Sequence, residues 1–200
     1  MRLLATKGCG SAIIELVFAV AGIGYVREEH DFASAEGKRA LLPYNPLAQV
    51  PTLILPDGAV MTETAAIALY IDELVPQAEL APARGDPLRR ELLRWLTFIV
   101  AAVYPTFTYG DDPSKWSCGA ELARATNAHR EALWRHLETV AIGPWFLGER
   151  FSMLDLYICV MTHWRPRRAW FAEHCPRLHA IALATDRDPR LAPILVANFG

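Results

Sequence analysis

The sequence predicts an α/β domain followed by an all-α helical domain. Strand-like and helix-like segments alternate over residues 1–76, whereas no convincing strand pattern follows residue 88. Between them, residues 77–87 contain Pro82, Gly85 and Pro87, a composition typical of a linker. We therefore expect domains at residues 1–76 and 88–200, joined by this linker.

The first domain opens with a strand, helix, strand and helix. A turn at residues 7–10 precedes the first helix, and Gly22 is placed to end that helix in the left-handed conformation. The two strands are expected to pair in parallel, because a helix connects them. The four elements are expected at residues 1–6, 12–21, 25–31 and 33–42.

A β-hairpin and a further helix follow. Val50-Pro51 precedes an apolar run at residues 52–55, and Pro56-Asp57-Gly58 is typical of a turn before a second strand at 59–61. Proline cannot donate to a sheet ladder, and an X-Pro bond adopts cis at a cost of only about 0.5–1 kcal/mol. A cis bond would direct the N–H and C=O of Val50 outward, where a peptide-like ligand can pair with them.

Glu63 and Thr64 lie at the start of the next helix, expected at residues 65–74. A helix N-terminus with a hydroxyl group and free N–H groups is a natural carboxylate site. The segment from Val50 to Thr64 therefore combines a backbone clamp with an anion site.

Two runs in this region resemble, in order and spacing, the glutathione-binding half of the glutathione transferase family. They are Asn45-Pro46-Leu47-Ala48-Gln49-Val50-Pro51-Thr52-Leu53 and Met61-Thr62-Glu63-Thr64-Ala65-Ala66-Ile67. The resemblance implies a thioredoxin-like N-terminal domain, glutathione as cosubstrate without a metal, and a homodimer. It also implies that Val50, before Pro51, pairs with the cysteinyl backbone of glutathione. Glu63 and Thr64 would hold the γ-glutamyl end, and Gln49 would face the glycyl carboxylate.

Glutathione transferases need a thiolate near neutral pH, although a free thiol has a pKa of about 8.5. Members that use tyrosine carry it near the end of the first strand, where this chain has Leu4-Ala5. The nucleophilic cysteine of bacterial members falls on Gly10, next to Cys9. Two alternatives stay open. Ser11 or a backbone N–H near Gly10 stabilises the glutathione thiolate, or Cys9 forms a mixed disulfide with glutathione.

Five helices are expected in the second half, and the clearest signal there is a capping box. Ser152 and Asp155 have the S-x-x-D spacing, and the family has such a box at the start of a buried helix. We assign this box to folding and not to chemistry. The five helices are expected at residues 88–107, 118–141, 153–164, 176–185 and 189–197.

The substrate pocket is expected between the two halves, because ligand sites favour domain interfaces. Tyr104, Tyr109 and Trp164 are the candidate walls for a small hydrophobic electrophile, and Pro105 is expected to kink or end its helix. The basic and aromatic run at residues 164–170 is interpreted as a connector or an inter-subunit contact.

Composition limits the class of protein. The 200 residues are 52% hydrophobic and 21% charged, and the net charge of −2 argues against a nucleic-acid or anionic-membrane surface. The four cysteines form no C-x-x-C pair, which is typical of reduced thiols in a cytoplasmic protein. No uncharged run reaches the roughly 18–20 residues of a membrane span. The histidines lack the spacing of a zinc site.

Three functions are consistent with these features. The first is an enzyme that conjugates or exchanges glutathione with a hydrophobic electrophile or a peroxide, as in detoxification. The second is a regulatory or partner-binding protein with the same fold and no catalysis, since fold does not determine function. The third is a glutathione-dependent isomerase, although Cys9-Gly10-Ser11 matches the Ser-Ser-Cys-type turn of such relatives poorly.

Overall fold

A computed structural model describes residues 1–110 and 112–200. Contacts between residues divide the chain into two compact units. The first contains Met1–Ala81 together with Thr185–Gly200, and the second contains Pro82–Ala184. The C-terminal segment therefore groups with the first unit, whereas the sequence suggested a helical domain over residues 88–200.

The first unit contains a four-stranded mixed sheet in the order β2-β1-β3-β4. Strand β1 pairs in parallel with β2 and antiparallel with β3, and β3 pairs antiparallel with β4. The expected order of strands and helices along the chain and the parallel first pair are confirmed. The strands are β1 (Arg2–Ala5), β2 (Val26–Glu29), β3 (Thr52–Ile54) and β4 (Val60–Met61).

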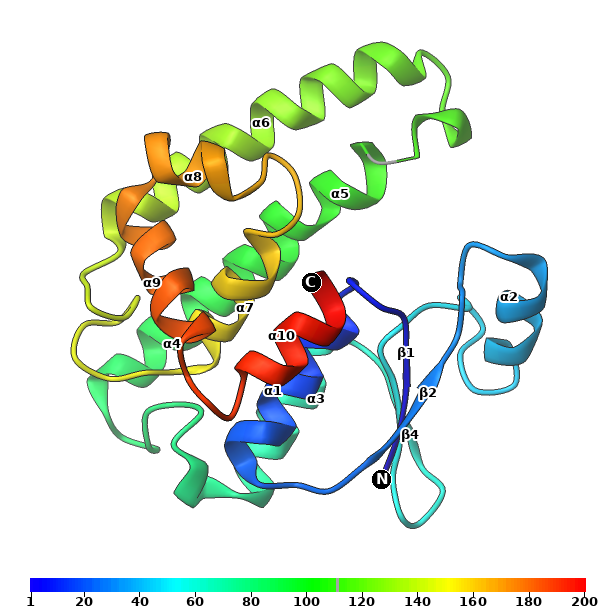
Figure 1. Cartoon of the computed structure of the whole chain (residues 1–200), viewed down its shortest axis with the longest axis horizontal. Helices are drawn as coiled ribbons and strands as arrows, with labels where there is room; N and C mark the ends of the chain where they lie inside the picture. Colours follow the sequence, from blue (N-terminus) through cyan, green and yellow to red (C-terminus); the bar gives the residue numbers. More distant parts are fainter. Residues whose placement is uncertain (111) are drawn as a thin grey trace. The chain divides into compact units, whose positions relative to one another are not determined.

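Helices cover this sheet. Figure 1 shows α1 and α3 on one side of the strands and α2 on the other. Gly22 follows α1 with φ of 65° and donates its N–H to Ala19, so it ends the helix as predicted. The C-terminal helix α10 contacts α1. These helices are α1 (Ser11–Ala21), α2 (Ala35–Leu41), α3 (Thr64–Leu74) and α10 (Ala192–Phe199), with a 3-10 turn η1 (Pro76–Ala78) after α3.

The core of the first unit lies between the sheet and helices α1 and α3. Apolar side chains of β1, β3 and both helices are fully buried there, as the short apolar strands and the apolar first helix predict. The fully buried residues include Leu3, Leu4, Ala5, Ile13, Leu16, Val17, Phe18, Leu53, Ile67 and Ile71.

In the described part of the second unit, the regular secondary structure is helical apart from one isolated bridge between Trp145 and Gly148. Together with the sheet of the first unit, this confirms the predicted fold class. Its elements are α4 (Pro87–Phe98), a π-helical segment η2 (Ile99–Val103), α5 (Tyr104–Gly110), a 3-10 turn η3 (Pro113–Lys115), α6 (Gly119–Val140), α7 (Met153–Met161), α8 (Arg168–His174) and α9 (Pro176–Asp186), whose last two residues fall in the first unit.

The helix expected at 88–107 is present and extends to Gly110. A π-helical segment interrupts it just before Pro105, because a proline inside a helix removes one hydrogen bond and crowds the preceding turn. One expectation about the second unit needs correction. The connector expected at 164–170 is partly wrong, since α8 already begins at Arg168. Helix α8 is formed because Phe171 is buried against Trp134, with ring centroids 5.1 Å apart.

The stretch Pro87–Gly110 has the length and composition of a membrane-spanning helix. Within its unit, α5 contacts α6, and Thr106 and Phe107 are buried. A core helix of a folded domain can have the same length and composition. That the protein has no membrane partner therefore stays a prediction.

Candidate functional site

Strand register brings three segments to one end of the sheet. Leu4 pairs with Thr52, so Pro51 and Val50 lie beyond the carboxyl end of β1, where the loop to α1 begins. Strand β4 runs back along β3, with Met61 opposite Leu53, so the start of α3 lies at this end as well. The loop before α1, the Val50-Pro51 bond and the N-terminus of α3 therefore come together, although they are far apart in sequence.

Val50 occupies the position expected for a backbone clamp. The Val50–Pro51 peptide bond is cis, as predicted. Val50 itself is half-buried and packs against Leu4, Leu41 and Ile54. In the described part of the chain, neither its N–H nor its carbonyl forms a hydrogen bond. An extended peptide could pair with both groups at this point.

Asn45 and Thr52 hold the loop before this clamp. Asn45 is buried; its Oδ1 accepts the N–H of Leu47 at 3.0 Å, and its Nδ2 donates to the carbonyl of Gln49 at 3.1 Å. The Thr52 hydroxyl donates to the same carbonyl at 2.9 Å. Sequence reasoning did not assign these two roles, although Asn-Pro is a known signal for turn initiation.

The N-terminus of α3 carries backbone donors without a side-chain cap. Glu63 is the N-cap residue, with φ of 66° and no capping hydrogen bond from its exposed side chain. The N–H groups at the first positions of the helix, from Thr64 to Ala66, form no hydrogen bond among the described residues. Gln49 is exposed. This terminus can bind a carboxylate, and Glu63 can bind an ammonium group beside it.

Ser11 begins α1 but is fully buried. Its hydroxyl donates to the carbonyl of Thr6 at 3.0 Å and accepts the N–H of Thr6 at 3.2 Å. The hydroxyl proton is therefore already engaged within the loop. By contrast, the N–H groups of Gly10 and Ser11 form no hydrogen bond in the part of the chain that the structure describes. Both residues are buried, and their N–H groups are the backbone donors at the start of α1 from which a thiolate could accept hydrogen bonds.

Cys9 has the electrostatic surroundings of a protonated thiol. Burial raises the pKa of Cys9 to about 11, and the carboxylates of Glu29 and Asp31 act in the same direction. A reactive cysteine needs a lowered pKa, because the thiolate is the nucleophile. The environment of Cys9 therefore opposes its use as a nucleophile at neutral pH.

The predicted substrate walls fall into two groups in the second unit. Tyr104 and Trp164 lie edge to face with ring centroids 5.5 Å apart, and Phe107 lies 5.2 Å from Trp164. Tyr109 instead pairs with Trp116, with a centroid distance of 5.3 Å, and is exposed. The structure thus joins Tyr104 to Trp164 and leaves Tyr109 with another partner.

The same unit carries a hollow of about 230 Å³. It is lined by Asn127, Arg130, Glu131, Arg165 and Pro166, so it includes none of the three predicted walls. Arg130 is buried; its Nη2 donates to the carbonyl of Thr106 at 2.6 Å, and its guanidinium lies over the Phe107 ring. This arginine joins α6 to α5.

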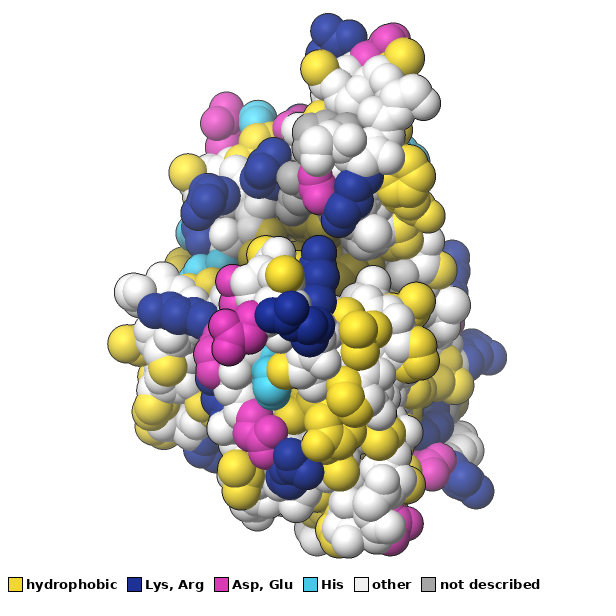
Figure 2. Space-filling model, turned by 90° about the vertical axis from the view of Figure 1, so that its right-hand side faces the viewer, with side chains coloured by type: hydrophobic (Ala, Val, Ile, Leu, Met, Phe, Trp, Pro, Cys, Tyr) yellow, Lys and Arg dark blue, Asp and Glu magenta, His cyan; other side chains and the backbone are white. Residues whose placement is uncertain are grey.

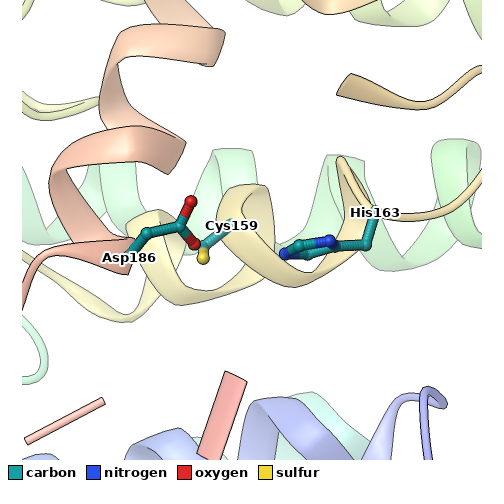
Figure 3. A group of neighbouring side chains, drawn as sticks. All are labelled: Cys159, His163 and Asp186. Carbon is teal, nitrogen blue, oxygen red and sulfur yellow. The ribbon is translucent and has the colours of Figure 1, made fainter. Parts of the chain in front are cut away.

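Figure 3 shows three side chains with metal-ligating atoms: Cys159, His163 and Asp186. Cys159 and His163 belong to the second unit, whereas Asp186 belongs to the first. Within the second unit, Nη2 of Arg168 lies 2.9 Å from Nε2 of His163 and 3.7 Å from Sγ of Cys159. A guanidinium beside both atoms repels a metal cation, so this cysteine and histidine are poor candidates for zinc ligands.

The face of the molecule in Figure 2 bears basic, acidic and apolar side chains in alternation. Nucleic-acid binding by phosphate neutralisation depends on a continuous basic surface. This one face does not offer such a surface, which agrees with the net charge of −2. The predicted absence of a nucleic-acid partner stays a prediction.

Comparison with known proteins identifies the family. Residues 11–74 match the model of the glutathione S-transferase N-terminal domain. The chain is 36% identical to the uncharacterized GST-like protein YncG of Escherichia coli (strain K12), over 99% of this chain and 98% of that protein. The chain belongs to the glutathione S-transferase family, as the sequence resemblance predicted.

Solved structures support the same assignment. A sphingomonad glutathione S-transferase complexed with glutathione is 28% identical, with a TM-score of 0.76 over 99% of this chain and 98% of that one. A glutathione transferase homolog from Sulfitobacter, with bound glutathione, has a TM-score of 0.89 over 100% and 98% of the two chains. At 24% identity, this second likeness shows the fold alone.

Proposed function

We propose that the protein binds glutathione at the end of the sheet where Val50, α1 and α3 meet, and conjugates it to a hydrophobic electrophile. The thiolate sulfur of intact glutathione bonds to the electrophilic carbon, and a leaving group departs or the product takes up a proton. The cysteinyl backbone of glutathione pairs with the N–H and C=O of Val50, beside Pro51. The γ-glutamyl carboxylate binds the N-terminus of α3 at Thr64, and Glu63 pairs with its ammonium group. Gln49 lies toward the glycyl carboxylate.

One observation carries this proposal. The backbone groups at Val50, at the start of α1 and at the start of α3 lack hydrogen bonds among the described residues, and all three lie at the same end of the sheet. Backbone polar groups in folded proteins are almost always paired with protein or water. A tripeptide with a carboxylate at one end and a thiol at its centre supplies the missing partners.

The thiolate would be stabilised by the backbone N–H groups of Gly10 and Ser11. Each unit by which the thiol pKa falls corresponds to about 1.4 kcal/mol of preferential binding of the thiolate. The positive end of the α1 dipole acts in the same direction. The hydroxyl of Ser11 shapes the loop through Thr6. In the alternative, this hydroxyl contacts the thiolate directly, and titration of bound glutathione in Ser11→Ala and Ser11→Thr decides between the two.

The electrophile would lie against aromatic side chains of the helical unit. Tyr104 and Trp164 form one apolar surface, and Tyr109 is a further candidate. The phenol of Tyr104 can donate a hydrogen bond to a leaving group. A homodimer in the cytoplasm, without a metal, completes the proposal by analogy with the family.

The test is a titration of bound glutathione. Thiolate absorbance in the ultraviolet is followed against pH for the wild type, Ser11→Ala, Ser11→Thr and Cys9→Ala. We expect a thiol pKa at least one unit below about 8.5 in the wild type and Cys9→Ala. If the N–H groups act, Ser11→Ala keeps most of the shift; if the hydroxyl acts, Ser11→Ala loses the shift and Ser11→Thr keeps it. An unshifted thiol in the wild type contradicts the proposal.

Two further readouts separate the alternatives. A non-catalytic protein would bind glutathione without turning over a chloronitrobenzene electrophile or a peroxide. An isomerase would convert a cis-dienoic acid without consuming glutathione. The proposed transferase consumes glutathione in proportion to the product formed.

A further inference from the structure

The C-terminal helix α10 connects to the loop that precedes α1. Figure 1 shows α10, in red, beside α1, in dark blue, and the two helices are in contact. Asn198, near the end of α10, is 4% exposed. Its Oδ1 accepts the N–H of Gly8 at 3.0 Å across 190 residues of sequence. A buried side chain from the end of the chain thus binds the backbone two residues before Gly10.

The Nδ2 group of the Asn198 side-chain amide binds a buried carboxylate. Its Nδ2 donates to Oε1 of Glu15 at 3.3 Å and to the carbonyl of Ile194 at 3.0 Å. Glu15 lies on α1, only 4% exposed, and its Oε2 accepts from Nε of Arg27 at 3.0 Å and from the hydroxyl of Tyr25 at 3.3 Å. The amide of Asn198 therefore joins α10, the loop before α1, and α1 itself.

Through Arg27, the contacts of Glu15 continue to Glu29, which binds the loop before α1 at a second position. Nη1 of Arg27 donates to Oε2 of Glu29, and Oε1 of Glu29 accepts the N–H of Lys7 at 3.0 Å. Two consecutive backbone N–H groups, those of Lys7 and Gly8, are thus bound by the two ends of one series of side chains. We call this series the loop network: Asn198, Glu15, Arg27 and Glu29.

We propose that Asn198 is a positioning residue for the thiolate site, acting through the loop network on the N–H groups of Gly10 and Ser11. This inference rests on the proposed function. Asn198 does not touch glutathione in this scheme. Its hydrogen bond to Gly8 fixes the conformation of the backbone that carries the two donors.

The backbone conformation of the loop makes this positioning necessary. Gly8 has φ of +75°, a left-handed conformation, and a side chain at this position would contact the carbonyl of Asn198 at 3.5 Å. A glycine in this region is free to adopt other conformations unless a contact restrains it. Hydrogen bonds to a developing thiolate weaken steeply as their angle departs from linearity. A change in the backbone conformation at Gly8 would shift the N–H groups of Gly10 and Ser11 and therefore reduce the stabilisation of the thiolate.

The test compares Asn198→Ala with Val196→Ala, a matched truncation on the same helix at a side chain that is 68% exposed. For each protein we would measure the thiol pKa of bound glutathione, the KM for glutathione, and hydrogen exchange of the amides of residues 7–11 without glutathione. For Asn198→Ala we expect a thiol pKa raised by about half to one unit and faster exchange, with the KM within about twofold. Val196→Ala should match the wild type.

A second variant keeps the test decisive if Asn198→Ala folds poorly. Asn198→Asp retains an oxygen acceptor for the N–H of Gly8 but loses the amide donated to Glu15, and it should also raise the thiol pKa. A lowered melting temperature with unchanged thiol pKa and unchanged loop exchange in both variants would overturn the inference. If the wild type itself shows no shifted thiol, the proposed function fails, and loop exchange alone then decides whether Asn198 positions the loop.

Discussion

Two kinds of helix N-terminus occur in this protein. At α7, Ser152 and Asp155 form a capping box, and the Asp155 carboxylate accepts hydrogen bonds from the N–H groups of Phe146 and Ser152 and from the Ser152 hydroxyl. At α1 and α3, the N-cap residues Gly10 and Glu63 make no side-chain capping bond. In the first kind, which we call a closed terminus, side chains of the protein pair with the N–H donors. In the second kind, which we call an open terminus, the donors stay unpaired among the described residues.

The difference separates a stabilising role from a binding role. A capped terminus satisfies its donors within the fold and adds to the free energy of unfolding. An uncapped terminus leaves its donors to water or to a ligand, and both uncapped termini named above lie at the same end of the sheet. Variants at the two kinds of terminus should therefore affect different measurements.

The largest effect is expected at the closed terminus. Asp155→Ala leaves the buried N–H groups of Phe146 and Ser152 without their partner, at about 1–3 kcal/mol each. We expect the free energy of unfolding in urea to fall by about 2–5 kcal/mol, while the folded fraction retains its activity. Ser34→Ala, which removes the half-buried cap of α2, is the control and should cost about 1 kcal/mol. A stable but inactive Asp155→Ala would contradict this assignment.

The same carboxylate should make stability depend on pH. Burial raises the pKa of Asp155 to about 7, although its hydrogen bonds favour the charged form. Between about pH 4 and pH 7 the folded state then holds a proton that the unfolded state, with a pKa near 3.9, has lost. The contribution of Asp155 to stability therefore falls as pH rises through this window, by up to about 1.4 kcal/mol per pH unit, and is constant above it.

Urea unfolding of the wild type and Asp155→Asn from pH 4 to pH 8 checks this dependence. The difference in unfolding free energy between the two proteins should decline up to about pH 7 and then level off. A difference that rises with pH would show that the hydrogen bonds outweigh burial and lower the pKa.

A smaller effect, on binding alone, is expected at the open terminus of α3. Thr64→Val removes the hydroxyl but keeps the shape of the side chain, and we expect glutathione affinity to fall by about threefold to tenfold, or about 1 kcal/mol. Thr64→Ser, which keeps the hydroxyl, should bind within about twofold of the wild type. Isothermal titration calorimetry measures both. A loss in Thr64→Ser with none in Thr64→Val would show that the methyl group, and not the hydroxyl, determines binding.

The smallest effect is expected at Cys9, next to the open terminus of α1. Because the pKa of Cys9 is raised to about 11, its thiol is protonated at neutral pH. We expect Cys9→Ala to keep kcat/KM within about twofold, and Cys9 to react with iodoacetamide more slowly than a free thiol at pH 7.5. Loss of activity in Cys9→Ala, with an unchanged melting temperature, would restore the mixed-disulfide alternative.

Much of the fold could be predicted because its signals are local. Gly22, the Val50-Pro51 bond and the capping box of Ser152 and Asp155 each depend on a few neighbouring residues, and the structure shows all three as expected. Helix α8 escaped prediction because its packing partners are far away in sequence: Phe171 is buried against Trp134, and the guanidinium of Arg135 lies over the Trp170 ring.

The sequence by itself determined the fold class, the family and the segments that form the proposed glutathione site, since these follow from short patterns and their spacing. Only the tertiary structure decided what surrounds the thiol. It engages the Ser11 hydroxyl with Thr6, places carboxylates near Cys9, and brings Asn198 to Gly8. Hydrogen-bond partners and electric fields depend on distances in space, and a linear pattern does not encode distances between residues that are remote along the chain.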